Sequence, residues 1–124
     1  AYTAVMDAYR LPRKTPEEKK VRTDTIQQAT RRATRVPLSV AEKALAVMAL
    51  AGTAVRHGNP NAISDAAVGA MLARAALQGA LFNVKINLQG IKDEAFVTQL
   101  RKKTATLDTK ARELETAILS DITL

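Results

Sequence analysis

The sequence contains no cysteine and only one histidine, His57. Disulfides, cysteine-bound metals and a thiol nucleophile are therefore excluded, and a histidine cluster that could hold a metal ion is excluded too. Tryptophan is also absent, and there are only two tyrosines and two phenylalanines. We expect no metal site and no resident cofactor.

The apolar residues that are present are mostly Ala, Leu, Val and Ile, and 47% of the 124 residues are hydrophobic. Small aliphatic side chains allow helices to pack closely, whereas sheets favour β-branched and aromatic side chains. The composition therefore favours an all-α fold. A chain of this length is expected to form a single helical domain over residues 1–124.

No uninterrupted apolar run reaches the roughly 20 residues that a membrane-spanning helix requires. No secretory signal is recognised either, so we expect a cytoplasmic protein without a membrane partner. The first residues, 1–6, are already in helical register with no capping residue before them. Helices usually begin after a cap, and we therefore expect the chain to be a fragment of a longer protein.

The net charge is +7, from 19 basic and 12 acidic residues. Such a surplus attracts anions in general, including nucleic acids, anionic membranes and anionic small ligands. The positive charges gather in residues 10–20, 31–35 and 92–110. Charged residues of a helical bundle mostly lie on its solvated outer face, and charge alone does not choose a ligand.

The sequence pattern predicts an antiparallel bundle of four to five helices. The first helix ends before Pro12, and the second begins at Thr15, where Thr15 and Glu18 can form a capping box around Pro16. Pro37 either kinks one long helix or separates two helices. Apolar residues then recur at three- and four-residue spacing until Gly58, which is expected to end this stretch in the left-handed conformation.

The next helix is expected to begin at Ser64 and Asp65 and to run to about Leu88. Its interior is rich in Ala and Gly. Interior glycines cost about 1 kcal/mol each relative to Ala, so we expect another backbone to approach this helix closely, at the bundle centre or across a dimer interface.

A long C-terminal helix is predicted to begin near Asp93 and Glu94. Its buried stripe is expected to consist of Phe96, Leu100, Leu107, Ala111, Leu114 and Ile118.

Several short motifs follow one another along the chain. Residues 58–59 are Gly-Asn in a loop, residues 64–66 read Ser-Asp-Ala, and residues 83–88 read Asn-Val-Lys-Ile-Asn-Leu. Further pieces are Ala1-Tyr2, Leu11-Pro12, Glu17-Glu18-Lys19, Val36-Pro37-Leu38 and Asp93-Glu94-Ala95-Phe96. This ordered series resembles the family of formiminotetrahydrofolate cyclodeaminases and methenyltetrahydrofolate cyclohydrolases over almost the whole chain.

The resemblance implies an all-helical enzyme that works as a dimer or a larger assembly. Its substrate would be a tetrahydrofolate derivative, with or without a polyglutamate tail. One branch of the family closes 5-formiminotetrahydrofolate to 5,10-methenyltetrahydrofolate and releases ammonia, and the other interconverts the 5,10-methenyl and 10-formyl forms. Both reactions move a proton as a leaving group departs, which a positioned carboxylate can do.

Asp65 is the candidate catalytic residue, because the Ser-Asp pair stands where the family pattern has it. The ordinary alternative is an acidic residue that caps the helix or complements its dipole. A helix N-terminus favours the carboxylate form, which suits a general base or a stabiliser of cationic iminium character. Ser64 and Asn61, which lie beside Asp65, are expected to contact the substrate.

Asn83 and Asn87 are four residues apart and therefore share a helix face. Their amides either bridge helices or bind the pterin edge, which presents alternating donors and acceptors. Asp65 lies on the same face as Asn83, but about five turns, or about 27 Å, away along the axis. Either a second subunit supplies one of these two residues, or the ligand is long.

Two family features are not found in this sequence. They are a glycine-rich segment ahead of the first helix and an acidic residue shortly before Ala1-Tyr2. The chain is therefore expected to be part of a cyclodeaminase-like domain. Arg31, Arg32 and Arg35 either hold an anionic glutamate tail or form a solvated face.

Two other function classes remain open from the residues themselves. One is a basic helical nucleic-acid-binding module, which the scarcity of aromatic residues and the lack of a helix-turn-helix or zinc signature disfavour. The other is a helical assembly protein without chemistry, supported by the long amphipathic C-terminal helix. We expect a homodimer with a folate substrate and no nucleic-acid partner.

Overall fold

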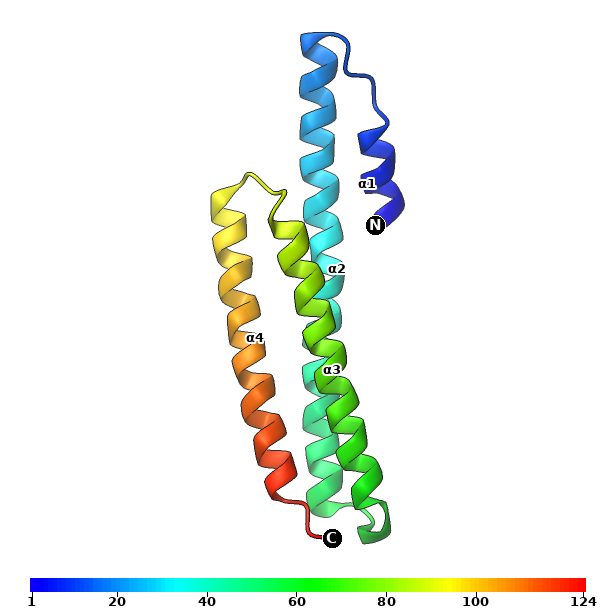
Figure 1. Cartoon of the computed structure of the whole chain (residues 1–124), viewed down its shortest axis with the longest axis vertical. Coiled ribbons are helices and arrows are strands. Elements are labelled where there is room, and N and C mark those ends of the chain that lie inside the picture. Colours follow the sequence, from blue (N-terminus) through cyan, green and yellow to red (C-terminus); the bar gives the residue numbers. More distant parts are fainter.

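The computed structural model describes all residues from 1 to 124 and contains four α-helices and no strand (Figure 1). Three of the helices are long and alternate in direction along the molecule, and the short α1 lies beside the first half of α2. The all-α prediction is confirmed, with a count at the lower end of the expected four to five. The helices are α1 Tyr2–Tyr9, α2 Pro16–His57, α3 Ile63–Leu88 and α4 Glu94–Ser120, with a short 3-10 turn, η1 Pro60–Ala62, before α3.

The 42-residue helix α2 contacts all three other α-helices. It begins as predicted, since the Thr15 hydroxyl accepts a hydrogen bond from the Glu18 N–H at 3.1 Å and the Glu18 carboxylate accepts one from the Thr15 N–H at 3.4 Å. Pro37 lies inside this helix without ending it. The single long helix is therefore the correct alternative, although proline in a helix interior costs about 3 kcal/mol.

Gly58 does not end α2 in the predicted left-handed conformation. Its φ is −83° and its backbone is extended, while its N–H still donates to the Ala54 carbonyl oxygen at 2.8 Å. A Cβ at this position would lie 2.4 Å from that oxygen, so the glycine is required by the close approach of the backbone rather than by a positive φ. The chain then enters η1, where the Asn59 side chain accepts a hydrogen bond from the Asn61 N–H.

The core lies where α2, α3 and α4 face one another. Four of the eight buried residues of α3 are alanines, and this helix lies against both α2 and α4, as expected for a helix at the bundle centre. The α4 stripe is also confirmed, because four of its predicted residues are buried and Phe96 and Leu114 are partly buried against the same core. The largest fully buried side chains are Met48, Leu77, Leu81, Ile118 and Val84.

The turn between α3 and α4 is fastened to α2 by one amide. The Gln27 side-chain nitrogen donates to the Gly90 carbonyl oxygen at 2.9 Å, and the Lys92 N–H donates to the Gln27 side-chain oxygen at 2.9 Å. Asp93 caps α4 as predicted by accepting a hydrogen bond from the Phe96 N–H at 3.2 Å. These bonds fix the position of the second half of α3 relative to α2.

Helix α1 is held against α2 by Arg22. Its Nε donates to the Tyr9 carbonyl oxygen at 3.2 Å, and its guanidinium carbon lies 5.4 Å from the centre of the Tyr9 ring. Ala8 is buried in the same contact. The N-terminal end of α1 is thereby placed near the middle of α2 (Figure 1).

The face of α3 that packs against neither α2 nor α4 is apolar and exposed. No atom other than neighbouring backbone lies within 4 Å of a Cβ built on Gly69 or Gly79, so nothing in this chain makes the close approach expected at these glycines. The exposed apolar face continues onto α2. It comprises Val36, Val40, Val47 and Leu50 of α2 and Val68, Leu72, Phe82 and Ile86 of α3.

Two segments, Pro16–His57 and Pro60–Leu88, are long and apolar enough to cross a membrane by length and composition. Core helices of soluble proteins pass the same test, so this finding is weak evidence. Both segments also carry charges within their apolar parts, Glu42 and Lys43 in one and Arg74 in the other. The expected cytoplasmic location without a membrane partner stays a prediction.

Replacing Leu77 by alanine should lower the free energy of unfolding by about 2–5 kcal/mol, because the fully buried side chain leaves a cavity among α2, α3 and α4. Leu119→Ala is the matched control, since Leu119 of α4 is 41% exposed and its loss should change stability by less than about 1 kcal/mol. Urea unfolding followed by circular dichroism measures both. Equal effects of the two substitutions would contradict the assigned core.

Candidate functional site

The largest cavity is an open groove of about 630 Å³ between the N-terminal end of α1, the middle of α2 and the second half of α3. Its volume falls in the range of small-molecule binding sites, about 300–1,000 Å³. Most of its lining is apolar, as is usual for small-molecule sites. The apolar wall includes Tyr2, Val5, Val36, Val40, Ala76 and Ala80.

The groove exists because α3 presents almost no side chain there. Ala76, Gly79 and Ala80 line it, and a Cβ built on Gly79 would meet nothing within 4 Å. On the α2 side, Val36 remains about half exposed instead of being covered by a neighbouring helix. The same small residues that suit close helix packing therefore leave an open apolar surface where no helix of this chain covers them.

The polar groups of the groove are Asn83 and Asn87, which lie one turn apart on α3. The Asn83 amide nitrogen donates to the Gly79 carbonyl oxygen of its own helix at 3.2 Å, so this residue does not bridge to another helix. This bond fixes the orientation of the amide and leaves its Oδ1 as an acceptor. Asn87 is half-buried and borders the same groove. The two predicted binding residues are thus brought together.

The other predicted site residues lie elsewhere. Asp65 and Ser64 are exposed in the first turn of α3, and Asn61 is exposed in η1. Because α3 is continuous, Asp65 is about 27 Å from Asn83 along its axis. Asp65 and Ser64 do not cap the helix, since Ala62 is the N-cap residue and no side chain bonds there. The carboxylate still complements the helix dipole.

Asp65 and Asn83 nevertheless lie on one continuous surface of α3. On α3, Leu72 and Gly79 lie between Asp65 and Asn83 at helical spacing, and all four are exposed. This side of α3 is the apolar face described above. An elongated ligand or a second chain lying on this face would contact both groups.

Two of the three arginines considered for an anionic tail are engaged in structural contacts. Arg31 forms an ion pair with Asp93, and its guanidinium lies 5.3 Å from the centre of the Phe96 ring. Arg35 lies over the same ring at 6.0 Å. Arg32 is exposed. Arg31 and Arg35 therefore serve mainly to hold α4 on α2.

Sequence reasoning missed part of the groove. The sequence predicts a kink or a break at Pro37, and both Pro37 and Tyr2 contribute to the family resemblance, but neither pattern predicts that the two residues line one groove together with Ala33. The available signal was an interior proline on the same helix face as Val36 and Val40. It was not sufficient, because the groove also needs α1 and α3, which are distant in sequence.

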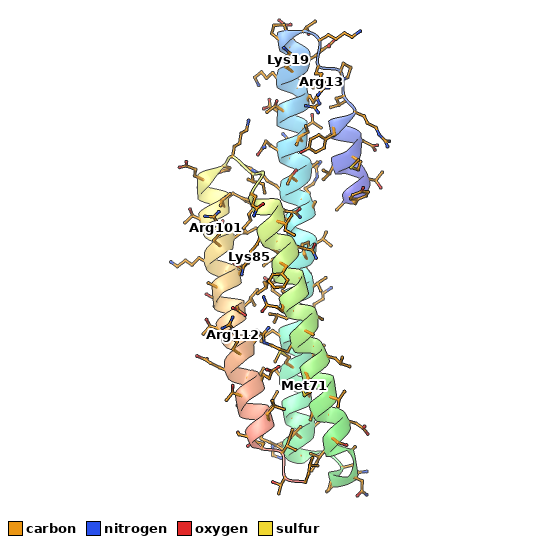
Figure 2. The ribbon with its side chains drawn as sticks, viewed as in Figure 1. Arg13, Lys19, Met71, Lys85, Arg101 and Arg112 are labelled. Atoms are coloured by element: carbon orange, nitrogen blue, oxygen red, sulfur yellow. The ribbon has the colours of Figure 1, made fainter.

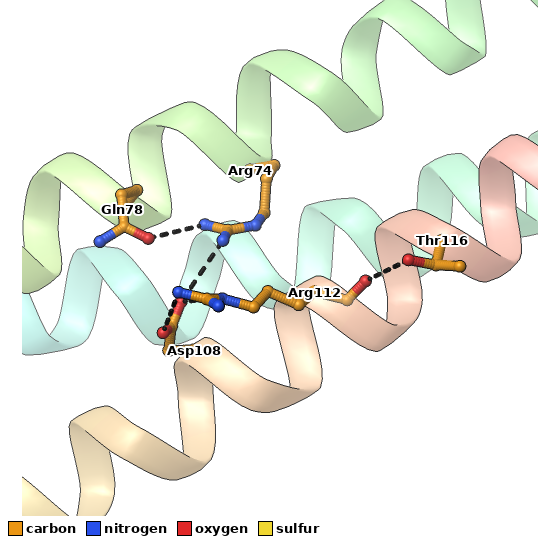
Figure 3. Close-up of polar contacts among 5 residues, drawn as sticks. All are labelled: Arg74, Gln78, Asp108, Arg112 and Thr116. Atoms are coloured by element: carbon orange, nitrogen blue, oxygen red, sulfur yellow. Dashed lines mark hydrogen bonds and ion pairs between the residues drawn. The ribbon is translucent and has the colours of Figure 1, made fainter.

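A second polar cluster lies on the other side of α3, between α3 and α4 (Figure 3). The Asp108 carboxylate pairs with Arg74 of α3 at 3.3 Å and with Arg112 of α4 at 3.0 Å. Arg74 also donates to the Gln78 side-chain oxygen at 3.1 Å. Figure 2 shows Arg112 on α4, near where it faces α3. The cluster joins two helices and satisfies its own charges, so its role is structural.

Comparison with known proteins gives the following likenesses. Residues 1–106 match the family described as Formiminotransferase-cyclodeaminase. The chain is 39% identical over 122 residues to a methenyltetrahydrofolate cyclohydrolase of Methylorubrum extorquens, and 36% identical over 120 residues to a formimidoyltransferase-cyclodeaminase of Gallus gallus. The matches cover 98% and 97% of this chain, but the chain spans only 59% and 22% of the two relatives.

Replacing Asp108 by alanine should lower the free energy of unfolding by about 1–3 kcal/mol, because it leaves the guanidinium of Arg74 without its ion-pair partner. The side chain of Arg74 is only 15% exposed and that of Asp108 only 20%. Arg112→Ala is the control, since Arg112 is 67% exposed and exposed ion pairs contribute about 0–1 kcal/mol. Chemical denaturation compares the two variants, and a larger loss in Arg112→Ala would contradict this ranking.

Proposed function

This chain belongs to the formiminotransferase-cyclodeaminase family, and on that premise we propose that it is part of an enzyme acting on one-carbon derivatives of tetrahydrofolate. The reaction is the cyclisation of 5-formiminotetrahydrofolate to 5,10-methenyltetrahydrofolate with release of ammonia, or the related hydrolysis of the methenyl form. The observation that carries the proposal is an apolar groove in which two asparagines of one helix face stand together.

The groove suits the reduced pterin ring of the substrate. Val36 and Val40 on α2 and Gly79 on α3 offer apolar surface to the faces of a flat ring. The amides of Asn83 and Asn87 offer donors and acceptors to its edge, which has an exocyclic amine, ring N–H groups and a carbonyl. Asn83 is held in place by Gly79, so part of the site is already ordered before a ligand binds.

The proton transfer is assigned to Asp65. In the cyclisation, N10 attacks the formimino carbon and its proton is transferred by the carboxylate to the nitrogen that leaves; one more proton from solvent completes ammonia. The exposed carboxylate at the start of α3 is suited to accept that proton and to stabilise the cationic methenyl product. Ser64 and Asn61 are proposed to contact the substrate beside it.

One copy of the chain does not bring Asp65 to Asn83. We therefore propose that a second copy lies on the exposed apolar face of α2 and α3 and completes the site. Exposed apolar surface of this kind marks association surfaces, and small residues such as Gly69 and Gly79 allow a close approach of helices. The anionic tail of the folate, with or without polyglutamate, would extend over a net positive chain.

Formimino- and methenyltetrahydrofolate are added separately to the full-length protein, and at least one of the two should be converted. The absorbance of the methenyl form should rise if the protein catalyses the cyclisation and fall if it catalyses the hydrolysis. Asp65→Asn should lower kcat by about 100-fold or more, because proton transfer contributes about 10²–10⁴-fold in enzymes. Asn83→Ala should act mainly on KM. The matched control is Glu94→Gln, which removes a first-turn carboxylate from α4 instead of α3. Full activity in a folded Asp65→Asn variant would remove this residue from the mechanism.

Leu72→Glu should shift the protein towards a monomer, because Leu72 is 66% exposed at the middle of the apolar face and a carboxylate there would be buried between two copies. Leu119→Glu is the control, since that residue lies on α4 outside the face. Light scattering after gel filtration measures the mass of each over a range of concentrations. A monomeric wild-type protein at all concentrations would contradict a second copy as the occupant of this face.

A further inference from the structure

Pro37 changes the hydrogen bonding of α2 at the groove. Proline has no backbone N–H, so the carbonyl oxygen of Ala33 lacks the donor that a regular helix supplies from four residues further on. No side chain of this protein donates a hydrogen bond to that oxygen. Elsewhere in α2 the hydroxyls of Thr30 and Thr34 each donate to the carbonyl oxygen of the residue four positions earlier. The carbonyl of Ala33 is therefore an acceptor without its helical partner.

Ala33, which carries this carbonyl, lines the groove. In a helix the carbonyl of one residue points along the axis towards the residue four positions later, on the same face. Ala33 and Pro37 both line the groove, so the gap between them opens on the groove side. The neighbouring wall consists of Val36 and Val40, which offer no polar partner. A ligand donor is the group that would satisfy the oxygen there.

We infer that the Ala33 carbonyl oxygen, which Pro37 leaves without its helical donor, accepts a hydrogen bond from the exocyclic amine of the pterin ring and selects for that amine. The inference rests on the proposed function. Asn83 and Asn87 bind the ring edge from α3, and the Ala33 carbonyl binds it from α2, so the ring is held from both sides of the groove. Pro37 is a positioning residue, because it acts through the carbonyl that it leaves unpaired.

A proline at this position lowers the stability of the helix. An alanine at position 37 would supply the missing N–H and suit the helix better. If Pro37 served only to hold the fold, its replacement would lower both the stability of the protein and its affinity for the ligand. Pro37→Ala is instead expected to raise the stability and to lower the affinity. That opposite movement separates a role in ligand selection from a role in folding.

The experiment compares binding of pterin and of lumazine, in which a carbonyl replaces the exocyclic amine, to the full chain by isothermal titration calorimetry. The wild-type protein should prefer pterin, because the lumazine carbonyl would face the Ala33 carbonyl. Pro37→Ala should raise the melting temperature by about 3 °C or more, weaken pterin binding about threefold to tenfold and reduce the pterin preference by a similar factor. An unchanged preference in Pro37→Ala overturns the inference.

Val40→Ala is the matched control, since it removes apolar wall from the same helix without changing backbone hydrogen bonding. It should weaken the binding of both ligands equally and leave the ratio of their dissociation constants unchanged. A changed ratio overturns the inference. The failure of this inference is distinguishable from that of the proposed function. Absence of pterin binding to the wild-type protein contradicts the proposed function, whereas binding with the same preference in Pro37→Ala contradicts only the role of the carbonyl.

Discussion

The close contact between α2 and α3 is the constraint on which the rest of the structure depends. It is made by small side chains, with Ala41 and Ala44 of α2 and Ala73 and Ala80 of α3 buried in one core. Because these residues project so little, the two backbones lie close over many turns, and larger side chains such as Met48 and Leu77 fill the remaining space. Helix α4 also approaches α2 closely where α2 has a small residue, since a Cβ on Gly52 would lie 3.1 Å from the side chain of Ile118.

The architecture and the groove have the same physical origin. A helix rich in Ala and Gly packs tightly on the side that has neighbours and presents a flat surface on the side that has none. At Ala76 and Gly79 this surface meets the α2 segment around Pro37, and α1, held by Arg22, closes one end. The groove is thus a place where three elements diverge and no large side chain fills the space between them. Its apolar walls are a consequence of the composition that builds the bundle.

Local signals were sufficient to predict the ends of most elements. The capping box at Thr15 and the cap at Asp93 are interactions between residues three apart, and such interactions can be recognised in a sequence. The fate of Pro37 could not be predicted, because the helix continues through it only when packing on both sides offsets its cost. The shared face of Asn83 and Asn87 could be predicted from helical periodicity. Their groove could not, because it also needs α1 and α2, which are distant in sequence.

The separation of Asp65 from Asn83 on one rigid helix restricts how a complete site can form. In a twofold-symmetric pair, a contact between one residue and another is made twice, with the roles of the two copies exchanged. Two antiparallel α3 helices that cross near the midpoint between Asp65 and Asn83 would place Asp65 of one copy beside Asn83 of the other, at both ends of the contact. The exposed residues next to that midpoint are Leu72, Ala75 and Ala76, which are apolar and mostly small, as a close crossing requires. The chain therefore has the surface properties that the proposed symmetric arrangement of two equivalent sites needs, in which each site would combine residues of both copies.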